Sequence, residues 1–370
     1  NQTYLSASTT NSGGILPNNS YNRYNFTARN TTHFLNDKLT LDIGAQYIVQ
    51  NNKNMVSQGQ YYNPLPSLYL FPRGDNFDEI RLYERYNTNY GYMEQYWPYG
   101  DASLSLQNPY WIQNRINRTS NKKRYMMNAS LKWQAADWLN VVGRVNLDNS
   151  DYRNKNEKSA STLTTFCGVS GGFEDAMRQE RSLYADFLAN IDKTFGDFHL
   201  TANVGASIYH TSMDQLYIAG DLVIPNFFQI NNINFSANYK PDPTGYEDEI
   251  QSIFASAELS WKNQLYLTVT GRNDWDSKLA FSKQKSFFYP SVGLSALLSE
   301  MVKLPEVISY AKIRGSYTVV ASSFDRFLTN PGYEYNSQTH NWANPTVYPM
   351  DNMKPEKTKS WEIGLNLKFW

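Results

Sequence analysis

The residue types that most often carry out catalysis or bind metal ions are few and scattered in this chain. Its four histidines, His33, His199, His210 and His340, show no spacing typical of a zinc site or a catalytic pair. The single cysteine, Cys167, excludes an intramolecular disulfide and any Cys-x-x-Cys site. No combination of nucleophile, base and orienting group stands out. We therefore expect no enzyme: no catalytic residue and no metal-binding residue is assigned.

Two acidic groups are the other places where chemistry could occur. One is the pair Asp274 and Asp276, and the other comprises Asp242, Glu247, Asp248 and Glu249. Paired carboxylates could serve a glycosidase or bind calcium, although no EF-hand spacing is present. Solvated loop charges are the favoured interpretation, so we expect no cofactor, with a structural calcium ion near Asp242 to Glu249 as a weaker alternative. Arg272 is expected to pair with Asp274 or Asp276 and to order this loop.

Aromatic side chains make up 15% of the 370 residues, and many of them lie in segment 51–118. Rigid amphipathic rings provide good contact surfaces for a protein partner, and they also stack on sugars. The alternative is an ordered loop that packs on itself. The aromatic candidates for contact with a ligand or partner are Tyr96, Trp97, Trp111, Trp275 and Trp342.

The elements that position these residues follow a two-residue period. In 38–50, Leu39, Leu41 and Ile43 alternate with polar residues, as on a strand with one apolar face. Most such segments reach the ~9–11 residues that a strand needs to cross a bilayer. We therefore predict about twelve strands, at 3–10, 21–34, 38–50, 124–135, 139–148, 183–193, 198–211, 250–261, 265–272, 287–299, 309–320 and 360–369.

The predicted connections alternate between short and long. Four short turns lie at Asn36-Asp37, Ala136-Asp137, Gly196-Asp197 and Lys262-Asn263, and a fifth connection at 300–308 includes about one helical turn. The long connections are 51–118, 149–180, 212–249, 273–286 and 321–357. Aromatic residues flank the short turns, as expected at a membrane interface. This pattern is typical of an all-β transmembrane antiparallel β-barrel with short periplasmic turns and long extracellular loops.

The polar residues of these strands are expected to face a water-filled lumen. The chain has 34 Lys and Arg against 34 Asp and Glu, so no net charge directs it toward nucleic acid. A soluble all-β protein, such as a propeller or a large sandwich, would also alternate and is the structural alternative. The lumen-facing candidates are Asp42, Gln46, Asn128, Ser130, Arg144, Asn146, Glu362 and Asn366.

Several long stretches resemble one known family. The runs LYLTVTGRNDWDSKLAFSKQKSFFYPSVGLSALLSE (265–300), ISYAKIRGSYTVVAS (308–322) and MKPEKTKSWEIGLNLKF (353–369) resemble the SusC/RagA family of TonB-dependent outer-membrane transporters from Bacteroidetes-type bacteria. The segment 4–31 is similar to the strand–loop–strand that follows the first barrel strands in this family. The order and spacing of these stretches match over nearly the whole chain.

The resemblance implies more than the periodicity does. Family members form a barrel of about 22 strands around a plug domain. They pair with a SusD-like surface lipoprotein and are energised by the TonB complex through an N-terminal box. We therefore expect residues 1–370 to be a fragment of one barrel domain in the bacterial outer membrane, with about twelve strands present and the plug, the TonB box and the last strands absent.

The resemblance leaves three function classes to compare. The first is active import of an oligosaccharide, or less favoured a peptide, together with the lipoprotein. The second is a secreted all-β protein that binds or acts on carbohydrate, and the third is a passive porin or adhesin. The neighbouring genes would separate glycan from peptide, which the residues alone do not.

Overall fold

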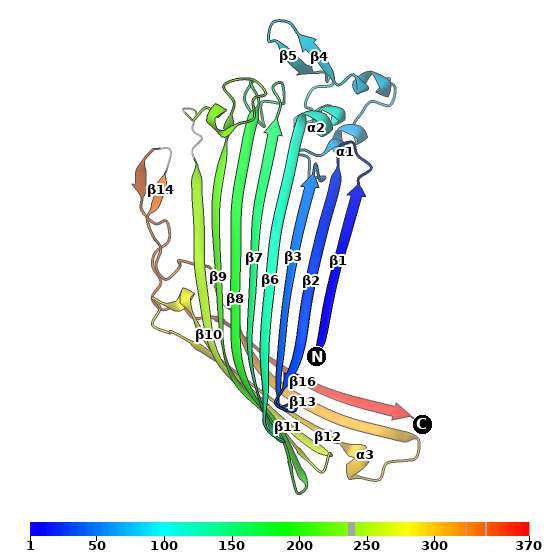
Figure 1. The fold of residues 1–370 in the computed structure, drawn as a ribbon, viewed down its shortest axis with the longest axis vertical. Helices are drawn as coiled ribbons and strands as arrows, with labels where there is room; N and C mark the ends of the chain where they lie inside the picture. The colour runs from blue at the N-terminus through cyan, green and yellow to red at the C-terminus, as the bar shows by residue number, and fades with distance from the viewer. Residues whose placement is uncertain (236–240, 323, 337–338, 370) are drawn as a thin grey trace.

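The computed structural model describes residues 1–235, 241–322, 324–336 and 339–369. One antiparallel sheet of twelve strands dominates the fold, and each strand pairs with its sequence neighbour in the sheet (Figure 1). Small elements in the long connections interrupt the numbering. In order, the sheet contains β1 (Gln2–Gly13), β2 (Ser20–Phe34), β3 (Leu39–Lys53), β6 (Ile116–Ala136), β7 (Leu139–Lys158), β8 (Gly172–Phe195), β9 (Phe198–Asp221), β10 (Asp242–Trp261), β11 (Leu265–Asp276), β12 (Phe287–Leu297), β13 (Ile308–Ser322) and β16 (Glu356–Phe369).

The short turns that the sequence predicts are confirmed, and their residues explain them. Asn36 and Asp37 have φ angles of 55° and 64°, and Lys262 and Asn263 have 51° and 55°. Leu35 is also left-handed (φ 54°), and these consecutive left-handed residues reverse the chain between the paired residues Phe34 and Leu39 and between Trp261 and Leu265. The fifth short connection contains one helical turn, α3 (Leu298–Met301), which begins two residues before the predicted connection 300–308, because β12 ends at Leu297.

Strands β6 to β10 extend beyond their predicted ends. β8 begins at Gly172 rather than at 183, and β9 ends at Asp221 rather than at 211. The prediction that 149–180 and 212–249 are loops is therefore wrong over much of their length. The ladder between β8 and β9 is continuous from the pair Gly172–Asp221 to the pair Phe195–Phe198. In these extensions both faces carry polar residues, so the hydrogen bonds persist while the hydrophobic alternation disappears.

The long connections contain the remaining elements and lie at the opposite end of the sheet from the short turns (Figure 1). The hairpin of β14 and β15 stands apart from the others, beside β10 in this view. No helix in the described part of the chain is long and apolar enough to span a membrane. The elements are α1 (Pro64–Tyr69), η1 (Phe77–Arg81), β4 (Glu84–Asn87), β5 (Tyr92–Gln95), α2 (Pro109–Arg115), η2 (Ile230–Asn232), η3 (Ser277–Leu279), β14 (Glu334–Asn336) and β15 (Asn341–Ala343).

One face of the sheet is a continuous apolar surface, which we call the apolar belt. Each of the twelve strands contributes to it a large apolar side chain that is between 43% and 74% exposed. Strand register places all of them on the same face; Val145, for example, lies opposite Ala129 on β6 and Ala185 on β8. The twelve are Leu5, Phe26, Ile43, Leu131, Val145, Phe187, Val204, Ile253, Val269, Val292, Ile313 and Ile363.

Buried apolar clusters lie outside the belt. One comprises Trp111, Ile112 and Ile116, and another is formed around Phe173 and Ile218. At the turn end of the belt, Phe195 and Phe198 stack with ring centroids 5.9 Å apart and are 48% and 40% exposed. Exposed aromatic rings beside an apolar band fit a membrane interface. Within the described residues, the apolar belt is therefore not packed against a second layer, in contrast to what a soluble sandwich requires.

The belt predicts opposite effects at neighbouring positions of β7. Val145→Arg would place a charge in the middle of the apolar face and should lower the free energy of unfolding by about 2–4 kcal/mol. The matched control Asn146→Arg lies on the other face and should change it by less than about 1 kcal/mol. Denaturant unfolding of the barrel in lipid vesicles measures both values. Equal losses at the two positions would contradict the assignment of the faces.

Candidate functional site

The face opposite the apolar belt, which we call the polar face, carries ion pairs between adjacent strands. Arg29 on β2 contacts Asp42 on β3, with Nη2 and Oδ2 2.8 Å apart. The hydroxyl of Thr31 donates a second hydrogen bond to the same carboxylate at 2.7 Å. In the register, Asp42 lies opposite Ser130, and Ser130 opposite Arg144, so the polar face runs on across β6 and β7.

The best-formed pair on this face joins Arg144 and Asp186. Arg144 donates from Nε and Nη2 to the two carboxylate oxygens at 2.9 and 2.7 Å, and the Tyr184 hydroxyl donates to Oδ2 at 2.8 Å. The Asp186 side chain is fully buried, while the Arg144 side chain is 46% exposed. This geometry is the bidentate form, which fixes orientation as well as charge.

Further pairs continue the pattern. Arg124 pairs with Asp148, and Arg314 pairs with Glu362 at 2.8 Å. The expected pair of Arg272 is confirmed with Asp274, at 2.7 Å between Nε and Oδ1. Asp276 accepts a hydrogen bond from the backbone N–H of Lys278 and caps η3 instead. The strands thus position the cations and carboxylates alternately on one surface.

All eight lumen-facing candidates lie on this polar face. Gln46 donates to Asn25 Oδ1 at 2.8 Å, and Asn128 lies opposite Asn146 in the register. Asn366 lies opposite Lys312, four residues from Glu362 along β16. Their contact with water in a lumen stays a prediction. The complete set is Asp42, Gln46, Asn128, Ser130, Arg144, Asn146, Glu362 and Asn366.

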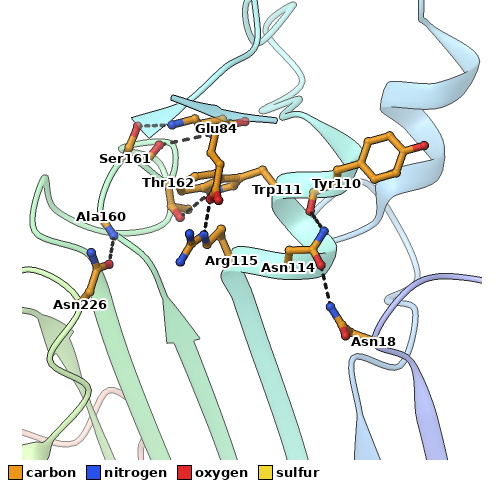
Figure 2. Close-up of polar contacts among 11 residues, drawn as sticks. Asn18, Glu84, Tyr110, Trp111, Asn114, Arg115, Ala160, Ser161, Thr162 and Asn226 are labelled. Atoms are coloured by element: carbon orange, nitrogen blue, oxygen red, sulfur yellow. Dashed lines mark hydrogen bonds and ion pairs between the residues drawn. The ribbon is translucent and has the colours of Figure 1, made fainter. Parts of the chain in front are cut away.

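Two segments, residues 54–115 and 159–171, cover the loop-side end of the polar face and contact each other. We call these two segments the cap. Trp111 is fully buried, and its Nε1 donates to Thr162 Oγ1 at 3.0 Å (Figure 2). Asn108, also fully buried, donates to the carbonyls of Ile80 and Tyr96 at 2.8 and 2.9 Å. Segment 51–118 therefore packs on itself and on segment 159–171, which agrees with the self-packed loop that was one of the two alternatives drawn from the sequence.

Other contacts fasten the cap to the rest of the chain. Figure 2 shows Arg115 directed to Glu84, and Asn18, from the β1–β2 connection, directed to Asn114. The backbone N–H of Ala160 donates to Asn226 Oδ1 at 2.8 Å. Four connections, β1–β2, β3–β6, β7–β8 and β9–β10, thus meet at one end of the sheet.

The aromatic candidates of segment 51–118 do not share one environment. The prediction that Trp111 contacts a ligand or a partner is wrong, because α2 directs its ring into the cap, where long-range packing buries it. Tyr96 is half-buried and lies 3.5 Å from the guanidinium of Arg85. Trp97 is half-buried, and its Nε1 donates to the Gly100 carbonyl at 2.7 Å. Tyr96 and Trp97 keep part of their surface available.

The two remaining aromatic candidates lie elsewhere. Trp275 is on strand β11 rather than in a loop, on the same face as Val269, and is 41% exposed. It therefore belongs to the border of the apolar belt. Trp342 on β15 is 69% exposed and packs on Tyr335 with ring centroids 5.1 Å apart. Contact of either residue with a ligand or a partner stays a prediction.

The acidic group from Asp242 to Glu249 lies on strand β10 rather than in a loop, so consecutive side chains point to opposite faces. Asp248 pairs with Arg326, and Glu249 lies 3.7 Å from His210. Within residues 1–235, 241–322, 324–336 and 339–369, no three acidic, histidine or cysteine side chains are arranged to hold a metal ion. The calcium site stays a prediction that this geometry does not support.

Comparisons with known proteins relate this geometry to a fold. The family described as TonB dependent receptor-like, beta-barrel matches residues 67–370. No curated protein matches the sequence. The RagAB peptide transporter matches with a TM-score of 0.73 and 14% identity over 95% of this chain and 39% of that chain.

The RagAB peptide importer in its open-open state gives a TM-score of 0.74 at 13% identity, over 100% of this chain and 40% of that chain. The siderophore receptor PiuA from Acinetobacter baumannii gives 0.54 at 11% identity, over 98% of this chain and 50% of that chain. The chain thus spans half or less of the length of these proteins. At such identities the similarity shows the fold alone, an antiparallel outer-membrane barrel wall.

The Arg144–Asp186 pair should contribute to stability. Arg144→Met would leave the buried Asp186 carboxylate without its cation and should cost roughly 1–3 kcal/mol. The double variant Arg144→Met/Asp186→Asn should recover much of that loss, because the buried negative charge is then removed as well. Free energies of unfolding for the two variants and the parent chain test this. A double variant that is less stable than the single variant would contradict it.

The cap should protect Cys167. This thiol is 7% exposed, and burial raises its pKa to about 12. At pH 8 only about one thiol in ten thousand would be ionised, so reaction with a maleimide should be slow. Trp111→Ala should loosen the cap and accelerate labelling, whereas Trp342→Ala, outside the cap, should not. Mass spectrometry over time measures the rates, and identical rates in all three chains would show that the cap does not shield the thiol.

Proposed function

We propose that this chain, which belongs to the TonB-dependent receptor-like β-barrel family, forms part of the wall of an outer-membrane nutrient importer. Proteins of this family lie in the bacterial outer membrane, and they are transporters rather than enzymes. The observation that carries the proposal is the pair of faces on one twelve-stranded sheet. One face is apolar and exposed on every strand, and the other carries ion pairs and amides.

The two faces support a membrane wall over a secreted carbohydrate-active protein. In water, a belt of twelve exposed large apolar side chains would make the protein aggregate. In a bilayer the same belt contacts lipid, while the opposite face provides hydrogen-bond partners for a polar solute. Strands that cross hydrocarbon must also satisfy their backbone groups laterally.

The arrangement of the whole importer is a further part of this proposal. In the described residues, β1 and β16 form the two edges of the sheet. Open edges are unfavourable in lipid, so we place the plug domain, the TonB box and the remaining strands outside residues 1–370. Coupling to the TonB complex would then use the N-terminal part of the larger protein.

We place a SusD-like lipoprotein on the cap. Tyr69, Tyr86 and Tyr90 lie there and are 86%, 61% and 63% exposed. Exposed tyrosines provide large, rigid contact area to a protein partner at low entropic cost. The lipoprotein would capture the nutrient and deliver it to the polar face beneath the cap.

The proposed substrate is a polar oligomer, with an oligosaccharide as the first candidate. Asparagine, serine and threonine on the polar face provide donors and acceptors for hydroxyl groups. A peptide is the second candidate, because the RagAB proteins, which share this fold, are described as peptide transporters and importers.

Uptake by living cells tests the proposal. Deleting the gene should abolish uptake of one fluorescent oligosaccharide or oligopeptide from a panel, and a plasmid copy should restore it. A protonophore should also stop uptake, since TonB-dependent import requires the inner-membrane proton gradient. Recovery of the protein in the soluble secreted fraction, or unchanged uptake of every compound, would refute the proposal.

A further inference from the structure

A pocket of about 330 Å³ lies on the polar face where the strands meet the cap. Its floor is one register row across the sheet, in which Asn52 on β3 lies opposite Ser120 on β6, and Ser120 opposite Asn154 on β7. Arg118 and Asn156 come from the next row toward the cap, and Met55 contributes from the cap itself. The pocket lies above the apolar belt, because the outward residues of β6 at this level are Thr119 and Asn121.

Two oxygen atoms in this pocket have no hydrogen-bond partner among the residues that the structure describes. Asn52 Oδ1 and Asn156 Oδ1 are both shielded from solvent and unpaired. The orientation of Asn156 is fixed, because its Nδ2 donates to Glu174 Oε2 at 3.3 Å. A buried acceptor without a donor is costly, so a water molecule, an ion or a ligand group is needed to complete its bonding. The pocket therefore offers acceptors for a hydroxyl or an N–H group.

The same pocket contains the guanidinium of Arg118, which no carboxylate of the described residues neutralises. Arg118 Nη2 donates to the Met55 carbonyl at 2.6 Å and Nη1 to the Ser57 hydroxyl, both neutral groups. Glu174, the nearest acidic lining residue, is already paired with Lys158. Within the described residues, Arg118 forms no ion pair, whereas Arg29, Arg124 and Arg144 on the same face below each have a carboxylate.

From these contacts we propose that this pocket binds a carboxylate group of the transported oligomer. Arg118 supplies the positive charge, Ser120 and Asn154 lie at the floor, and the oxygens of Asn52 and Asn156 accept neighbouring hydroxyl or N–H groups. The proposal rests on the transport function proposed above and narrows its substrate class to acidic oligomers. The carboxylate could belong to a uronic acid or to an acidic peptide.

Calorimetric titration of the complete detergent-solubilised transporter tests the pocket directly. The probes are trigalacturonic acid and its methyl ester, and an Ala-Ala-Glu tripeptide with its fully amidated form. The free acid of one pair should bind at least about tenfold more tightly than its neutral form, with an advantage that falls as salt rises. The pair that shows this difference identifies the source of the carboxylate.

Variants of the pocket locate the binding. Ser120→Asp places a carboxylate beside Arg118 and should remove most of the preference for the acid. Arg118→Met should do the same, and Arg118→Lys should retain part of it because the charge remains. Asn121→Asp is the matched control, since this exposed residue is adjacent on β6 but faces outward. Heat-dependent gel migration verifies that each barrel is folded.

The outcomes separate this inference from the proposed function. Equal affinity for acid and neutral probes, or an acid preference that Ser120→Asp leaves intact, would overturn the pocket assignment. In that case cells could still take up the oligomer, so the proposed import function would remain supported. If calorimetry shows an acid preference that Ser120→Asp abolishes, while cells take up no oligomer, the pocket assignment is supported and the import function is refuted.

Discussion

Backbone hydrogen bonding within a sheet is the constraint on which this structure depends. In hydrocarbon, an unpaired N–H or C=O group is costly, so each long strand must be bonded to a neighbour along its length. The chain meets this requirement by pairing each strand of the sheet with the strands that precede and follow it, through short turns at one end and long connections at the other. Side chains then alternate between two environments, and the apolar belt and the polar face follow from that alternation.

The same constraint explains how much the sequence could predict. Inside the belt, Leu39, Leu41 and Ile43 alternate with polar residues, so the strand and its faces were predictable from residue type alone. Above the belt, β8 continues through Arg178 and Glu180 with polar residues on both faces, and only the backbone ladder reveals the strand. The Arg272–Asp274 pair was predictable because its members are two residues apart on one face.

Contacts between side chains that are distant in the sequence could not be predicted from the sequence. Asp186 is the partner of Arg144, yet the residues lie on different strands, and only the register brings them together. Trp111 looked like any other loop aromatic, because nothing in its neighbours shows that Thr162 will accept its indole N–H. Sequence periodicity thus gives the face of a residue, whereas its partner depends on the strand register and on the cap.

Charge divides the polar face into two regions with different consequences for a solute. Beside the belt, Arg29, Arg124 and Arg144 are each neutralised by a carboxylate, so a passing solute meets hydrogen-bonding groups without a strong net attraction. Below the cap, Arg118 is not neutralised and shares its donors with Met55 and Ser57 of the cap. A guanidinium has five N–H groups, so a bound carboxylate would compete with the cap for some of them. Occupation of the proposed pocket would therefore be coupled to attachment of the cap through this one side chain.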